Sequence, residues 1–131
     1  MSIEELIRGV RAKYPHSRLE AATAQPLESL AEVFGKTPPE YPSLLRQLGH
    51  GVIGRNEFML YSGPVPAEEI LPGEDAVIGV LLIGDDLAGH HVGYKRAGDR
   101  WIVVEFDHGS PEEMQTDDSL YDALSRILSI A

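Results

Sequence analysis

The sequence predicts an α+β fold, a single domain over residues 1–131 in which a twisted, mostly antiparallel sheet is flanked by N-terminal helices and a C-terminal helix. Two observations predict this fold. Apolar residues recur at helical spacing in the first 50 residues and again near the end, whereas the middle of the chain has the alternation and the apolar runs of strands. A chain of 131 residues has room for one hydrophobic core, and no repeat or linker divides it.

The first helix is expected directly after Ser2, because Ser2 and Glu5 have the spacing of a capping box. The apolar residues that follow lie on one helical face: Ile3, Leu6, Ile7 and Val10. A second helix is expected from Pro26 to Gly35, with one apolar stripe formed by Leu27, Leu30, Ala31 and Phe34.

A third, short helix carries Leu44, Leu45 and Leu48 and ends at Gly49. Its start is not defined by the pattern, because Pro42 biases Tyr41 away from helical backbone angles. The last helix is expected after Ser119, which can cap it. Its apolar face contains Leu120, Leu124, Ile127 and Leu128.

Four segments between these helices read as strands. "GRNEFMLYSG" (54–63) alternates, with Phe58 and Leu60 on one face and Met59 and Tyr61 on the other, and "AVIGVLLIG" (76–84) is a continuous apolar run typical of a buried strand. "HHVGYKR" (90–96) and "WIVVEFD" (101–107) are expected to form a hairpin around Gly98. A turn centred between residues 98 and 99 pairs His90 with Asp107, Val92 with Glu105, Tyr94 with Val103, and Arg96 with Trp101.

The second hairpin strand has two different faces. Ile102, Val104 and Phe106 form an expected core face. The opposite face combines an aromatic side chain with carboxylates, a composition that suits a partly exposed binding surface: Trp101, Val103, Glu105 and Asp107. The alternative is that Trp101 only covers the edge of the core.

The stretch "LLIGDDLAGHHVGY" (81–94) places Asp85 and Asp86 close to His90 and His91, and these side chains are plausible metal ligands. If a strand begins at residue 90, however, the two adjacent histidines point to opposite faces and cannot hold one ion together. A turn explains the same residues, because the aspartates can accept hydrogen bonds from turn amides and Gly89 permits a positive φ. The pattern therefore favours a turn, with His90 and Asp107 as a cross-strand charge pair.

No other catalytic pattern is present in the sequence. Its remaining histidines, His16, His50 and His108, are expected in separate loops. There is no nucleophile elbow, phosphate-binding loop or helical zinc motif. The carboxylates Glu105 and Asp107 share a strand face, so glycosidase-like chemistry is conceivable, but nothing else in the sequence favours it.

The composition limits the kinds of partner. There is no cysteine, which excludes disulfides and thiolate chemistry and fits a cytoplasmic protein. The amino terminus lacks the pattern of a signal peptide, and no segment is long enough to cross a bilayer. The net charge of −10 disfavours direct binding to nucleic acid or anionic membranes and favours a basic partner.

The order of the elements resembles the SUKH superfamily. The resemblance rests on "PPEYPSLLRQLGHGVIG" (38–54), with Pro38, Tyr41, Leu44, Leu45, Gly49 and Gly51 at the expected spacing. It continues through "FMLYSGPVPAEEI", "IGDDLAG", "VVEFDHG" and "DDSLYDAL" and so covers most of the chain from Pro26 onward. Pro42 and the pair His90-His91 depart from the family's pattern. The resemblance implies a protein-interaction module, in bacteria often the immunity partner of a secreted toxin such as a nuclease.

We therefore expect a non-enzymatic module that requires no cofactor or metal and binds a basic protein. A nuclease toxin is one basic protein that would fit this role. The expected contacts lie on the hairpin face and the adjoining turns: Asp85, Asp86, His90, Trp101, Glu105 and Asp107. The alternative is a metal-dependent hydrolase that uses Asp85, Asp86, His90 and His91.

Overall fold

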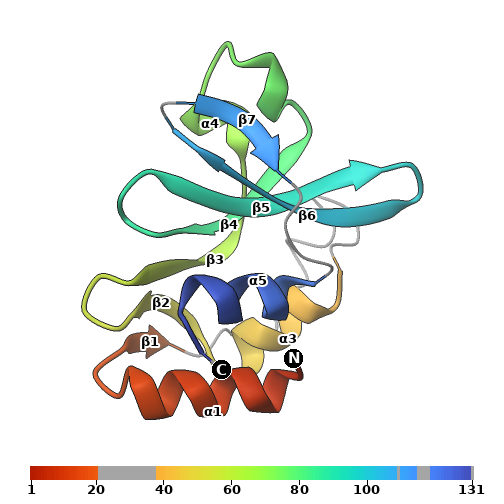
Figure 1. Ribbon diagram of the computed structural model, residues 1–131. Coiled ribbons are helices and arrows are strands. Elements are labelled where there is room, and N and C mark those ends of the chain that lie inside the picture. The colour runs from red at the N-terminus through yellow and green to blue at the C-terminus, as the bar shows by residue number, and fades with distance from the viewer. Residues whose placement is uncertain (21–37, 109, 115–118, 131) are drawn as a thin grey trace.

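The computed structural model describes residues 1–20, 38–108, 110–114 and 119–130, and it is an α+β fold (Figure 1). The helix expected from Pro26 to Gly35 lies outside the described residues. In chain order the elements are α1 (Ile3–Lys13), β1 (Arg18–Glu20), α3 (Glu40–Gln47), β2 (His50–Ile53), β3 (Phe58–Pro66), α4 (Ala67–Ile70), the 3₁₀ helix η1 (Asp75–Val77), β4 (Val80–Asp85), β5 (His90–Ala97), β6 (Arg100–Asp107), β7 (Ser110–Met114) and α5 (Leu120–Ile127).

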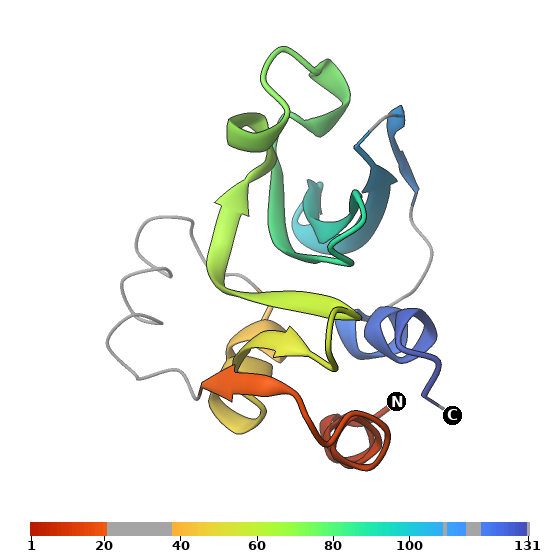
Figure 2. The ribbon, with the colours of Figure 1, turned by 90° about the vertical axis from the view of Figure 1, so that its left-hand side faces the viewer.

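The described strands form one antiparallel sheet in the order β1-β2-β3-β4-β5-β6-β7, so each strand pairs with its neighbours in the sequence. The sheet is strongly twisted and curved (Figure 2). Helices α1, α3 and α5 gather at one end of the molecule, and α4 with η1 lies at the other (Figure 1). The predicted fold class is confirmed.

Among the described residues, two apolar clusters form the core, one for each face of the sheet. The larger cluster packs α1, α3 and α5 against the sheet and includes Leu6, Leu44, Phe58, Val103 and Leu124. The smaller cluster packs α4 and η1 against the opposite face and includes Ala67, Val77, Leu82, Val104 and Phe106. Since successive side chains of a strand alternate between faces, neighbouring residues of β6 contribute to different clusters.

The helix caps agree with the expected signals. Ser2 and Glu5 form the capping box of α1, and the Asp122 amide donates to Ser119 Oγ at the start of α5. The sequence pattern left the start of the third helix undefined; α3 begins at Glu40 and includes Tyr41 although Pro42 follows it. Pro42 therefore lies in its first turn, where the missing amide hydrogen costs no helical hydrogen bond.

The expected strand over residues 76–84 starts later than predicted. Residues Asp75–Val77 form η1, and β4 begins only at Val80. Gly79 has a φ of 81°, which interrupts an extended backbone, yet Val77 before it is fully buried. The apolar residues of this segment predicted correctly that Val77 is buried, but they did not predict which element it belongs to. A buried 3₁₀ turn and a buried strand are both apolar, so composition does not distinguish them.

The β5–β6 hairpin has the predicted register, with His90 opposite Asp107 and Arg96 opposite Trp101. The predicted core face of β6 is also confirmed, since Val104 and Phe106 are buried. The opposite face was expected to be partly exposed, and it is so only at its two ends, where Asp107 is exposed and Trp101 is partly buried. Val103 is 2% exposed and Glu105 is 1% exposed, because the larger apolar cluster, with helix α5, covers that side of the sheet.

Candidate functional site

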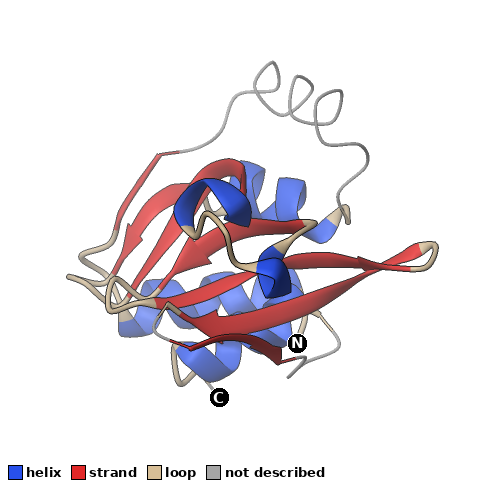
Figure 3. Cartoon of the chain, turned by 90° about the horizontal axis from the view of Figure 1, so that it is seen from above, coloured by secondary structure: helices blue, strands red, loops and turns tan. Residues whose placement is uncertain are grey.

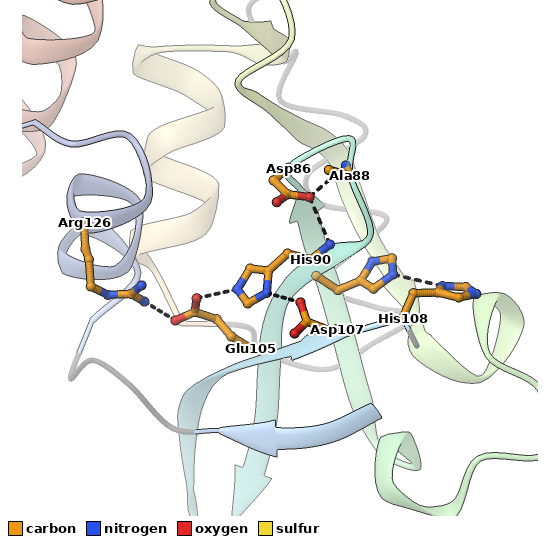
Figure 4. A network of polar contacts seen from close by, with 8 residues as sticks. Asp86, Ala88, His90, Glu105, Asp107, His108 and Arg126 are labelled. Atoms are coloured by element: carbon orange, nitrogen blue, oxygen red, sulfur yellow. Dashed lines mark hydrogen bonds and ion pairs between the residues drawn. The ribbon is translucent and has the colours of Figure 1, made fainter. Parts of the chain in front are cut away.

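Five of the six residues predicted to form a binding site lie at one end of β4, β5 and β6. Figure 4 shows most of them, with His90, Glu105 and Asp107 pointing toward one another and Asp86 above them in the β4–β5 turn. The structure brings His90, Glu105 and Asp107 into direct contact. Asp85 is the last residue of β4 and Asp86 follows it in the turn, whereas Trp101 lies at the other end of the hairpin.

The two aspartates hold the turn between β4 and β5, as the turn interpretation predicts. The Leu87 amide donates to Asp85 Oδ1 at 2.7 Å. The amides of Ala88 and His90 both donate to Asp86 Oδ1, at 2.8 and 2.9 Å. Gly89 has a φ of 97°, the positive value expected of it. Both carboxylates therefore stabilise local backbone structure.

His90 bridges two carboxylates across the hairpin. Its Nδ1 lies 2.8 Å from Asp107 Oδ1 and its Nε2 lies 2.7 Å from Glu105 Oε1. Arg126 from α5 contacts the other oxygen of Glu105, so the buried carboxylate lies between two basic groups (Figure 4). The network joins β5, β6 and α5.

The two carboxylates change the pKa of His90. Partial burial opposes the charged ring, but hydrogen bonds and charge attraction from Glu105 and Asp107 outweigh burial, and the pKa of His90 is raised. The geometry agrees with this direction, because both ring nitrogens lie within hydrogen-bond distance of carboxylate oxygens, and a protonated imidazole can donate to both. Both ring nitrogens of His90 are therefore engaged by carboxylates of the protein itself.

His91 lies on the opposite face and has a different environment. Its Nε2 is 3.2 Å from Nδ1 of His108, its ring packs against Phe106, and its buried Nδ1 has no hydrogen-bond partner in the described structure. Burial lowers the pKa of His91, which keeps the ring neutral. His108 lies in a turn, as expected, but its contact with His91 was not predicted. It follows β6, and the hairpin register brings it diagonally next to His91.

His50 also differs from expectation, because it lies in strand β2 and not in a loop. The four side chains of the alternative metal site do not converge: His90 and His91 face opposite sides of the sheet, and Asp86 is bonded to turn amides. Within the residues that the structure describes, no group of three or more acidic or histidine side chains is placed to hold a metal ion.

Trp101 is partly buried and packs against the larger cluster. Its ring meets Tyr94 edge-on at 6.5 Å, and Arg96 lies over it at 5.3 Å from the ring centre. Trp101 therefore covers the edge of the core, as the alternative interpretation stated, and part of its side chain remains exposed.

Three of the predicted site residues have partners that were not expected from the sequence. Arg126 contacts Glu105, His108 contacts His91, and the Tyr61 hydroxyl donates to Asp85 Oδ2 at 2.5 Å. The register could have indicated His108. Arg126 and Tyr61 come from elements 21 and 24 residues away from their partners, and no local pattern connects them.

Charge is unevenly distributed along the chain. Residues 1–60 contain seven basic and seven acidic residues, whereas residues 61–131 contain four basic and fourteen acidic ones, which accounts for the whole net charge. No lysine or arginine occurs between Arg55 and Lys95. That stretch includes residues 67–79, which contain α4 and η1. We term residues 67–79 the acidic cap.

The acidic cap presents four exposed carboxylates: Glu68, Glu69, Glu74 and Asp75. Glu68 accepts a hydrogen bond from the Gly79 amide at 3.1 Å, which helps to close the cap. In the described parts of the chain, none of the four forms an ion pair with lysine or arginine. Ile78 beside them is 58% exposed.

Comparison of the chain with protein-family models, curated proteins and solved structures finds no match. Among the described helices, none has the length and apolar character needed to cross a membrane.

Proposed function

We propose that this protein is a non-enzymatic binding module that holds a basic protein partner through its acidic surface. The observation that carries the proposal is the concentration of the net charge of −10 in residues 61–131, where the acidic cap exposes carboxylates that have no lysine or arginine partner among the residues the structure describes. A surface of one sign attracts a partner of the other sign and accelerates their encounter.

The resemblance to SUKH proteins supports a more specific form of this proposal. In that form the protein is an immunity protein of the cytoplasm, and its partner is a toxin such as a nuclease. A nuclease is basic where it grips phosphate, so an acidic module would occupy the surface that nucleic acid otherwise contacts.

The structure changes where the partner is expected to bind. Of the predicted contact residues, Glu105 is buried, and Asp85 and Asp86 are bonded to turn amides. Asp107 retains a side chain that is 64% exposed. The acidic cap offers more accessible charge, so we place the main contact there, with Asp107 as a further contact.

The geometry does not favour the hydrolase alternative. Both ring nitrogens of His90 are bonded to carboxylates, and His91 is 6% exposed. Both ring nitrogens of His90 and at least one oxygen of each aspartate are thus already hydrogen-bonded within the protein.

The test begins with affinity capture of the partner from the source cell, followed by affinity measurements between the two purified proteins. Glu69→Gln/Asp75→Asn removes two charges from the acidic cap, and Glu20→Gln/Glu57→Gln removes two exposed charges from the neutral half. The two variants have equal net charge, so they separate local contact from overall attraction.

We expect the cap variant to weaken binding by about tenfold or more and the control variant by about twofold or less. Binding of the wild type should also weaken as salt is added. An acidic partner, or equal effects of the two variants, would contradict the proposal.

A further inference from the structure

The β5–β6 hairpin projects from the body of the protein (Figure 3). At its tip Gly98 has a φ of 66°, and apart from Gly98 and its two chain neighbours no described residue has a heavy atom within 4 Å of the position that a Cβ would occupy there. Arg96 and Arg100 on either side are exposed. We term residues 95–101 the hairpin tip.

The hairpin tip has a charge opposite to that of its surroundings. Of the four basic residues in the acidic half of the chain, three lie in the hairpin tip: Lys95, Arg96 and Arg100. Asp99 is the single acidic residue among them. A small positive surface therefore extends from a half of the chain that is otherwise strongly negative.

Ring contacts connect the hairpin tip to the core. Arg96 lies over Trp101, Trp101 meets Tyr94 at 6.5 Å, and Tyr94 meets Tyr41 at 6.5 Å, each ring pair edge-on. The Arg96 Nε also donates to the Gly98 carbonyl at 3.3 Å. These contacts limit the motion of Arg96 before any partner arrives, which reduces the entropy lost on binding. Arginine and tryptophan are also the residues most often found at the centre of protein interfaces.

We propose that the hairpin tip is a second interaction surface, which binds a carboxylate-rich segment of a polypeptide. A guanidinium group matches a carboxylate in shape and charge. A thin peptide can reach the projecting hairpin tip without placing its own charges against the acidic cap. A nucleic acid would bring a long row of phosphates near that cap and would find few cations along its path. This surface is separate from the one proposed for the basic partner.

The probe is a fluorescein-labelled oligoglutamate peptide, whose binding is followed by fluorescence anisotropy at low salt. Arg96→Gln/Arg100→Gln removes two charges from the hairpin tip. Arg8→Gln/Arg11→Gln removes two exposed charges from α1 and serves as the control of equal net charge. Circular dichroism verifies that both variants remain folded. A single-stranded oligothymidylate of the same charge as the peptide is titrated in parallel.

The wild type and the α1 variant should bind the peptide with similar affinity, whereas the hairpin variant should bind at least about tenfold more weakly. Absence of binding by the wild type, or equal weakening in both variants, would show that the hairpin tip is not such a site. Tighter binding of the oligothymidylate through the same arginines would overturn the assignment of a polypeptide ligand. Neither outcome bears on the partner of the acidic cap.

Discussion

The adjacent residues His90 and His91 occupy opposite faces of the same strand and differ in almost every physical respect. The His90 ring contacts Glu105 and Asp107, and Glu105 in turn contacts Arg126. The pKa of His90 is raised. His91 packs against Phe106, and its pKa is lowered by burial. One face of the sheet at this point holds a charged network, and the other holds a neutral apolar contact.

The comparison shows that proximity in the sequence says little about shared chemistry in a strand. Two histidines after two aspartates suggest one polar site, yet the alternation of the strand divides them between two environments. Each environment can be tested by a substitution with a control on the same face.

The largest effect is expected from the apolar face. Phe106 is fully buried between the His91 ring and the smaller cluster, so Phe106→Ala should lower the free energy of unfolding by about 4 kcal/mol. Urea unfolding followed by circular dichroism measures this. Met59→Ala, at a position 37% exposed, should cost less than about 1 kcal/mol. Similar costs would mean that this face is not a packed core.

A smaller effect is expected from the charged face. Glu105→Gln keeps the shape of the side chain but removes the charge between His90 and Arg126, and it should cost about 2 kcal/mol. Asp107→Asn removes the exposed carboxylate from the same histidine and should cost less than about 1 kcal/mol. Equal losses in urea unfolding would contradict the central role given to Glu105.

The two histidines should give opposite dependences of stability on pH. The raised pKa of His90 means that its contribution is present below the unfolded value and is lost as pH rises through the folded pKa. The lowered pKa of His91 means that stability is lost as pH falls below its unfolded value, because only the unfolded chain then takes up the proton.

The free energy of unfolding of His90→Gln and His91→Gln should therefore be measured between about pH 5 and 9. His90→Gln should reduce the loss of stability on the alkaline side, and His91→Gln should reduce the loss on the acidic side. The effect of each should be about 1 kcal/mol. If both substitutions change the same side of the profile, the separation of the two environments is wrong.

The smallest effect is expected in the turn that leads to both histidines. Leu87 has a φ of 62°, a left-handed backbone conformation that is unfavourable for a bulky residue, and its side chain is 45% exposed. Leu87→Gly should raise the free energy of unfolding by about 0.5 kcal/mol, because glycine adopts this conformation without steric cost. Ile78→Gly, at an exposed position with a φ of −62°, should give no such gain in thermal unfolding.

Several features of the protein follow from local sequence alone. The hairpin register, with His90 opposite Asp107, follows from the position of Gly98 and the lengths of the two strands. The roles of Ser2 and Ser119 as helix caps, and of Asp86 in the turn, follow from short-range hydrogen bonds. These interactions join residues a few positions apart, or opposite each other across one turn, so the pattern of neighbours is sufficient to predict them.

Tertiary structure decided which of these surfaces remain exposed. A period of two identifies the residues that share a face of a strand, but it does not reveal whether a helix covers that face. Glu105 was expected at the surface and is buried, because α5 returns to that side of the sheet and brings Arg126 to it. Likewise, Tyr61 reaches Asp85 only because β3 pairs with β4. Burial and partner choice depend on elements distant in the chain, and their packing is a property of the whole fold.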